Sequence, residues 1–320
     1  MEPVEAYLTE LRDTRSTGSA VAETSYYHAL QRLLNEIGKD LKPKVKCIMS
    51  LSNRGAGLPD GGLFTADQFQ KSGEPLPGQI PARGVIEVKP VRSELQIVSE
   101  SEQVARYWGK YRQVLVTNYR NFCLIGQNEN GEMLELESYS LADNDINFWT
   151  QIMHPRKMAE EHKERFPEYL KRVMMHAAPI ASPEDVAWFL ASYARDAKVR
   201  IEKTDLPALL PIREALEEAL GLKFEGEKGD HFFRSTFIQT LFYGVFSAWV
   251  LWHQENPTRT DKFDWKSASH YLNVPMIQIL FEQLSAHSKV KPLGLIEVLD
   301  WASLVLNRVD RIQFFDVFEQ

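Results

Sequence analysis

A short apolar run interrupted by two charges constrains this chain more than any other feature. Gly84-Val85-Ile86-Glu87-Val88-Lys89-Pro90 has the length and β-branched content of a buried strand, yet it carries a carboxylate and an ammonium group two positions apart. Successive strand residues point to opposite faces, so Glu87 and Lys89 share one face. Upstream, Gly57-Leu58-Pro59-Asp60-Gly61-Gly62 predicts a tight turn that presents the carboxylate of Asp60.

These three charged residues are the set that Mg²⁺-dependent cleavage of a phosphodiester requires. Mg²⁺ takes oxygen ligands and needs only one or two protein carboxylates when a phosphate supplies the rest. Asp60 and Glu87 are the candidate pair, with the backbone carbonyl of Val88 as a further ligand and Mn²⁺ as a substitute metal. Lys89 would position the attacking water or offset charge on the transition state. The alternatives are a solvated strand face and an ordinary Pro-Asp-Gly turn.

The order and spacing of these motifs resemble the active site of the PD-(D/E)xK nuclease superfamily. The resemblance implies an α/β fold, a restriction-endonuclease-like mixed sheet flanked by helices, and cleavage of double-stranded DNA. It also implies an acidic residue on the helix before the core strands, and Glu23 fits that position. Apolar residues at helical spacing follow Glu23 and stop at Gly38, which predicts a helix there. An ordinary first-turn helix charge is the alternative for Glu23.

A second helical motif lies downstream of the charged strand. Gln103-Val104-Ala105-Arg106-Tyr107 resembles the Gln-x-x-x-Tyr motif of the RecB-like branch of the superfamily. Gln103 and Tyr107 are four residues apart and therefore share a helix face. We expect this face to look into the cleft near Lys89, with a core-facing tyrosine on an amphipathic helix as the alternative.

The character of the chain changes once along its length. Residues 1–150 mix helices with strands expected at 44–51, 63–64, 84–89, 113–118, 121–127 and 133–139. After about residue 148 strand signals disappear, and helices are expected at 160–176, 182–203, 206–220, 231–252, 264–274, 276–286 and 293–306. We therefore predict a nuclease domain at 1–150 and an all-helical connector or interaction domain at 151–320.

Composition limits the partners and the location. The formal net charge is −7 at pH 7, so any contact with nucleic acid must come from local basic patches. Two cysteines exclude a disulfide framework, and the acidic N-terminus lacks a signal-peptide profile. The longest apolar run, 236–252, is short for a membrane span and predicts a buried helix. We expect a cytoplasmic protein without a membrane partner. The candidate basic residues are Lys39, Lys42, Lys44, Lys46, Arg106, Lys110, Arg112 and Arg120.

Longer segments carry a more specific resemblance. The run from Glu23 to Gly62, which includes Arg54-Gly55-Ala56-Gly57, and the run Tyr107-Trp108-Gly109-Lys110-Tyr111 resemble the N-terminus of single-chain restriction-modification enzymes. In those enzymes a helical connector and an adenine-specific methyltransferase follow the nuclease. No Gly-rich methyltransferase loop occurs in this sequence. The resemblance implies that a methyltransferase or specificity region acts in cis or in trans.

These observations together predict a metal-dependent endodeoxyribonuclease of a restriction-modification or phage-defence system. The rival from another class is a catalytically silent scaffold that binds DNA or protein and keeps a nuclease-like fold. A repair or junction nuclease is a third alternative. The complete set of Asp60, Glu87 and Lys89 favours the active enzyme over the silent module.

Overall fold

A computed structural model describes residues 2–18, 23–51, 57–71, 73–128, 131–256 and 261–318. The chain forms two compact units, Met1–Ala178 and Pro179–Gln320. The sequence placed the division after residue 150, whereas the contacts place it after Ala178.

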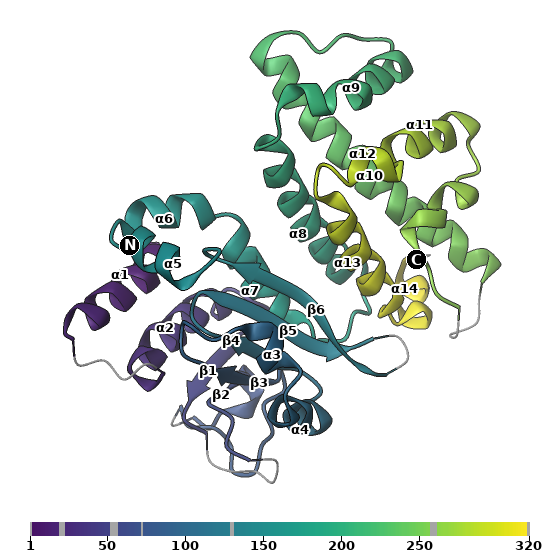
Figure 1. Cartoon of the computed structure of the whole chain (residues 1–320). Helices are drawn as coiled ribbons and strands as arrows, with labels where there is room; N and C mark the ends of the chain where they lie inside the picture. The colour runs from purple at the N-terminus through teal and green to yellow at the C-terminus, as the bar shows by residue number, and fades with distance from the viewer. Residues whose placement is uncertain are drawn as a thin grey trace. The chain divides into compact units, whose positions relative to one another are not determined.

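The first unit is built on one open sheet of six strands, which lie in the order of the sequence (Figure 1). All six predicted strands are present within a few residues of the expected bounds. β3 and β4 run parallel and every other neighbouring pair is antiparallel. The fold class is therefore mixed α/β with a mostly antiparallel sheet. The strands are β1 (Val45–Met49), β2 (Gly61–Thr65), β3 (Val85–Val88), β4 (Val114–Thr117), β5 (Asn121–Gln127) and β6 (Met133–Ser140).

The parallel pair at the centre of the sheet depends on a helical crossover. A parallel neighbour cannot follow through a tight turn, so the chain passes through α3 (Leu95–Ser99) and α4 (Glu102–Tyr111) before β4. β3 and β4 are buried along their whole length, which explains why both are rich in valine. Val104 of α4 packs with strand residues in a core cluster that also contains Val85, Val114, Val116, Cys123 and Ile125.

Helices from both ends of the unit pack with the sheet. α1 (Pro3–Ser16) contacts α2 (Tyr27–Gly38), and α2 contacts β1 and α7 (Arg165–Met175). Asn35 of α2 docks this helix on β1, because its side chain accepts from the Cys47 amide at 2.7 Å and donates to the Cys47 carbonyl at 3.3 Å. The remaining elements are the 3₁₀ turns η1 (Thr24–Tyr26) and η2 (Ala66–Gln68) and the helices α5 (Asp145–Gln151) and α6 (Pro155–His162).

Aromatic packing explains why the first unit extends beyond residue 150. Phe166 of α7 packs against Phe122 of β5, with ring centroids 4.8 Å apart, and stacks on Tyr139 of β6 at 5.1 Å. The buried amide of Gln113 also donates to the Val173 carbonyl at 2.7 Å. The helix expected over 160–176 is therefore two helices, α6 and α7, and both belong to the sheet unit.

The second unit contains helices and, among its described residues, one isolated β-bridge, Ile180 to Val309. Helix α10 is the centre, as its nearly all-apolar sequence predicted, since it contacts α8, α9, α11 and η3. The helix expected over 264–274 is instead the 3₁₀ helix η3. None of the described helices has both the length and the apolar character needed to cross a membrane. The elements are α8 (Pro183–Glu202), α9 (Leu206–Leu220), α10 (Gly226–Glu255), η3 (Trp265–Tyr271), α11 (Pro275–Ser285), α12 (His287–Val290), α13 (Leu295–Asn307) and α14 (Arg311–Phe318).

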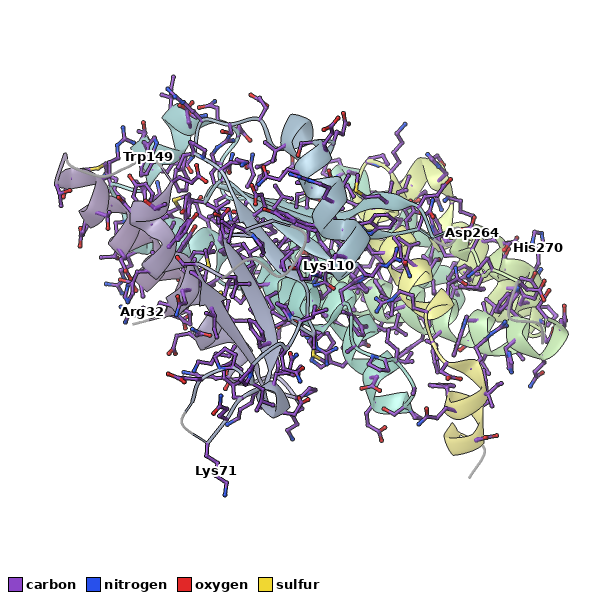
Figure 2. The ribbon with its side chains drawn as sticks, turned by 90° about the horizontal axis from the view of Figure 1, so that it is seen from below. Arg32, Lys71, Lys110, Trp149, Asp264 and His270 are labelled. Atoms are coloured by element: carbon purple, nitrogen blue, oxygen red, sulfur yellow. The ribbon has the colours of Figure 1, made fainter. Side chains whose placement is uncertain are left out.

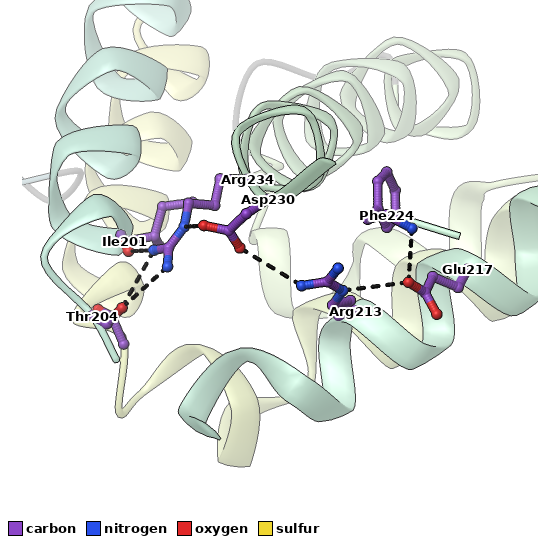
Figure 3. A network of polar contacts seen from close by, with 7 residues as sticks. All are labelled: Ile201, Thr204, Arg213, Glu217, Phe224, Asp230 and Arg234. Carbon is purple, nitrogen blue, oxygen red and sulfur yellow. Dashed lines mark hydrogen bonds and ion pairs between the residues drawn. The ribbon is translucent and has the colours of Figure 1, made fainter. Parts of the chain in front are cut away.

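Paired charges join three helices of the second unit (Figure 3). Arg234 of α10 donates to Asp230 at 3.0 Å and to two backbone carbonyls, that of Ile201 in the last turn of α8 and that of Thr204 just beyond the end of that helix. Arg213 of α9 bonds Glu217 on its own helix at 3.3 Å and faces Asp230 at 3.8 Å. Each arginine thus meets a carboxylate, which is the usual way to keep charges in a helical core.

Candidate active site

The carboxylate of Asp60 accepts one hydrogen bond from a side chain and one from the backbone, and the Asp60 carbonyl accepts a third. Its Oδ1 accepts from the Tyr27 hydroxyl at 2.5 Å, and its Oδ2 accepts from the Val88 amide at 2.7 Å. The Asp60 carbonyl accepts from the Ser50 amide at 2.5 Å. The next residue, Gly61, allows this close approach of β1, because a Cβ there would lie 2.6 Å from the Met49 sulfur.

Asp60 lies where the pairing of β2 with β3 stops. The two strands pair only at Gly61–Ile86 and Gly62–Val85, whereas β3 and β4 pair at four positions. The Val88 amide therefore has no partner on β2, and the Asp60 side chain takes its place. This arrangement brings the turn carboxylate to the end of the charged strand, as the motif predicted.

Glu87 is a buried carboxylate that is only half satisfied. Its exposed fraction is 1%, and its Oε1 accepts from the Lys89 ammonium at 2.6 Å. No donor among the described residues reaches its Oε2, which is fully buried. Burial raises the pKa of Glu87 to about 7, helped by the charges of Asp60 and Glu23, although Lys89 works in the opposite direction.

Lys89 bridges the buried carboxylate and the surface. Its side chain is one quarter exposed, while that of Glu87 is almost fully buried. Burial alone would lower the pKa of Lys89, but the bond to Glu87 and the charges of Glu23 and Asp60 outweigh it and raise that pKa. Lys89 is thus held as a cation at the edge of an acidic cluster.

Glu23 joins this cluster from outside the sheet. It precedes η1 rather than occupying the first turn of an α-helix, which corrects the expected helical position. Its carbonyl accepts from the Tyr119 hydroxyl, and the Tyr119 carbonyl accepts from Tyr7 of α1 at 2.8 Å. Burial raises the pKa of Glu23, and Asp60 raises it further while Lys89 lowers it. Four predicted residues, Glu23, Asp60, Glu87 and Lys89, therefore lie within electrostatic reach of one another.

The Gln103–Tyr107 pair departs from the expectation. Gln103 donates to the Tyr107 hydroxyl at 3.2 Å, so the predicted shared helix face exists. Tyr107, however, is only 2% exposed and belongs to the hydrophobic core cluster. Its side of the helix therefore faces the core. Gly57, at φ +109°, lies against the tyrosine ring. The hydroxyl of Tyr107 is influenced by the acidic site. Burial raises the pKa of Tyr107, and the charges of Glu87 and Asp60 raise it further.

Tyr27 is the site residue that sequence reasoning missed. Its neighbour Tyr26 carries the apolar spacing of α2, and no motif marked Tyr27 itself. Burial is the main cause that raises the pKa of its phenol. The hydrogen bond to Asp60 and the nearby acidic charges raise it further. The signal available in the sequence was a polar-tipped aromatic residue shortly after the candidate acid Glu23.

The predicted basic residues have different environments. Arg120 is buried and donates to the carbonyls of Ala142 and Asp143, so it is a structural residue and not part of a surface patch. Arg106 and Lys110 lie on α4, where Lys110 is labelled in Figure 2. They share the helix face of Gln103 because the three residues are spaced by three and four positions. Residues 52–56, which carry part of the restriction-enzyme resemblance, lie outside the described residues.

Comparison with family models, with curated proteins and with solved structures found no match to this chain. Within the described ranges, no group of three or more His, Cys, Asp or Glu side chains has the arrangement of a metal site. A site of two carboxylates, completed by a backbone carbonyl and a substrate phosphate, is not of that kind.

Proposed function

We propose that this chain is a Mg²⁺-dependent endodeoxyribonuclease that hydrolyses phosphodiester bonds of double-stranded DNA. One observation carries the proposal: Glu87 is buried with an unpartnered oxygen, and it lies beside Lys89 and the anchored carboxylate of Asp60. Buried carboxylate oxygens are normally paired, so an unpartnered oxygen within an acidic cluster fits the role of a cation ligand.

The donor set fits a hard divalent cation. Asp60, Glu87 and the backbone carbonyl of Val88 would hold Mg²⁺ or Mn²⁺, since all three offer oxygen ligands. When bound, such a cation stabilises charge on a phosphate and acidifies a water molecule. The raised pKa of Glu87 agrees with this role, because a cation would remove the cost of ionising that buried group.

The side chains have separate tasks in this proposal. Lys89 is fixed by its bond to Glu87 and reaches toward the surface, where it would orient the attacking water or bind the phosphate oxygen that gains charge. Glu23 adds a third carboxylate whose charge lies within electrostatic reach of Asp60 and Lys89. Gln103 and the Tyr107 hydroxyl would lie near this cluster, although Tyr107 is buried and its ring belongs to the core.

The sheet supports a restriction-endonuclease-like fold, because the meander β1–β2–β3 and the crossover to a parallel β4 make a mixed sheet with helices around it. By the motif resemblance, the physiological setting is cytoplasmic restriction-modification or phage defence, with a methyltransferase or specificity region in cis or in trans. The helical unit would then be the connector.

The decisive experiment is plasmid cleavage by the full chain in Mg²⁺, Mn²⁺ and EDTA. Asp60→Asn and Glu87→Gln should each lower the cleavage rate roughly 10³-fold, since each removes a charged metal ligand worth several kcal/mol of transition-state stabilisation. Asp67→Asn, which alters an exposed carboxylate on η2, should cleave like the parent. Intact plasmid under all conditions, with DNA or protein binding retained, would instead support the silent scaffold.

A further inference from the structure

The hydrogen bond between Tyr27 and Asp60 has a role that none of the sequence motifs assigns. Tyr27 donates to Oδ1 at 2.5 Å while the Val88 amide donates to Oδ2 at 2.7 Å. We propose that Tyr27 is a positioning residue, which fixes the rotation of the Asp60 carboxylate so that its remaining lone pairs converge on the space beside Glu87.

Two donors on opposite oxygens are what such a role requires. A carboxylate bonded through one oxygen still turns about its Cβ–Cγ bond, because that torsion is broad. A second donor on the other oxygen defines the plane of the group. Each oxygen accepts two hydrogen bonds, so one lone pair on each is left for another ligand. With both donors in place, only one orientation of Asp60 satisfies the Tyr27 hydroxyl and the Val88 amide together.

The position of Tyr27 is itself rigid. Tyr27 is the first residue of α2, and that helix buries Leu30, Leu33, Leu34 and Ile37. Asn35 fixes α2 to the Cys47 backbone of β1, the strand that pairs with β2 next to Asp60. The phenol is therefore aimed from a helix that is docked on the same sheet, which is how supporting residues hold metal-binding side chains in place.

The phenol acts as a donor and not as a base. A tyrosine hydroxyl keeps its proton at neutral pH, and an ionised carboxylate can only accept. Tyr27 therefore touches Asp60 and acts through it. The consequence for metal binding rests on the proposed function, whereas the effect on the carboxylate itself does not.

The first test is metal-free and uses Tyr27→Phe in the full chain, which removes one oxygen and keeps the ring. The Val88 amide reports on the Asp60 carboxylate because that carboxylate is its acceptor. We expect hydrogen exchange at Val88 to become about tenfold faster, while exchange at Val85, whose amide bonds the Gln113 carbonyl, stays unchanged. Unchanged exchange at Val88 in a folded Tyr27→Phe protein would overturn the positioning role.

The control variant is Tyr139→Phe. Its hydroxyl bonds His162 at 2.9 Å, so it also loses one tyrosine hydrogen bond, but at another place in the same unit. It should leave Val88 exchange at the parent value. Faster Val88 exchange in both variants, in step with a lower melting temperature, would mean general loosening and would also overturn the proposal. Tyr27→Leu provides a second variant should the first fail to fold.

The second test is calorimetric titration with Mn²⁺. Supporting residues of metal ligands typically contribute 10- to 100-fold to affinity, so Tyr27→Phe should bind Mn²⁺ about tenfold more weakly, and Tyr139→Phe like the parent. Parent affinity in Tyr27→Phe, with binding lost in Asp60→Asn, would overturn the positioning role and leave the proposed function standing. Parent affinity in Asp60→Asn would overturn the proposed metal site, and with it the effect of Tyr27 on metal binding. The hydrogen exchange of Val88 would still decide whether Tyr27 orients the Asp60 carboxylate.

Discussion

Two glutamates, one in each unit, show opposite uses of a carboxylate. Glu217 in the helical unit accepts from Lys223 at 2.7 Å, from the Phe224 amide at 2.9 Å and from Arg213 at 3.3 Å. These bonds lower its pKa to about 2. Glu87 in the sheet unit has one ammonium partner and one unpartnered oxygen, and burial raises its pKa to about 7.

The difference separates structural charges from a candidate reactive one. Glu217 joins α9 to the start of the following segment, and every contact stabilises its ionised form. Glu87 lies where ionisation is unfavourable. An apolar side chain at the same position would avoid the free-energy cost of burying a carboxylate. Strongly perturbed acids of the second kind concentrate at functional sites. The contrast therefore favours the first unit as the place of the proposed chemistry, and it favours a structural role for the charged network of Figure 3.

The largest expected effect concerns the bounds of the unit that holds Glu87. A fragment of residues 1–178 should fold, whereas a fragment of residues 1–150 should not. The shorter fragment loses large buried side chains worth about 2 kcal/mol each, which together approach the total stability of a domain. They are Phe166, Tyr169, Leu170, Val173 and Met174. Circular dichroism and thermal melting would measure this. A cooperative melt of the 1–150 fragment near that of 1–178 would place α6 and α7 outside the functional unit.

The two glutamates also offer matched lysines. Lys89→Ala should lower DNA cleavage at least 100-fold while DNA affinity stays near the parent value, because one lysine supplies little of the phosphate contact energy. Lys223→Ala removes a lysine that bonds a glutamate at similar distance, and should cleave like the parent. Cleavage rates and binding titrations on the same DNA measure both. Equal activities in the two variants would erase the functional contrast between Glu87 and Glu217.

The smallest effect is a difference in pH dependence. The folded pKa of Glu87 lies above its unfolded value, so its contribution to stability is complete below about pH 4.5 and disappears as the pH rises through about 7. Glu87→Gln should therefore flatten the dependence of unfolding free energy between pH 5 and 8, by on the order of 2 kcal/mol. Glu217 has a lowered folded pKa, so its contribution is complete above about pH 4.5 and is lost as the pH falls toward 2.

Glu217→Gln should consequently change the curve only in acid. Urea unfolding of both variants across pH 3–8 would compare them directly. A Glu87→Gln protein with the parent slope in the neutral range would show that Glu87 is not held against ionisation.

Much of the sheet followed from the sequence because its strands are short, apolar and rich in valine. The spacing of Glu87 and Lys89 likewise fixed their common face. Helix α1 was missed, although Val4, Tyr7, Leu8 and Leu11 are buried on one side, because its charged residues hid the helical spacing of its apolar ones. The compact first unit also ends at Ala178 rather than near residue 150, because a helical pattern does not show which sheet or bundle a helix will cover.

The site was predictable only where its residues are close in sequence. The ring of Tyr107 has a core environment made by strands far along the chain, and the spacing of a helix face cannot distinguish core from cleft. The contact of Tyr27 with Asp60 spans the whole of α2 and β1, so no local pattern encodes it. Glu23 was placed correctly near the cluster, but its anchor is Tyr119, a residue 96 positions away.

The Val88 amide has a consequence for how relatives of this chain should be interpreted. Asp60 replaces a missing strand partner for that amide, so the fold itself benefits from an acceptor at position 60. A relative without the proposed activity would still be selected to keep aspartate or asparagine at this position. The presence of an aspartate at position 60 in a relative is therefore only weak evidence of catalytic activity. The more informative position is 87, because a buried carboxylate with one unpartnered oxygen costs the fold free energy, and we expect relatives without activity to replace it first with an apolar residue.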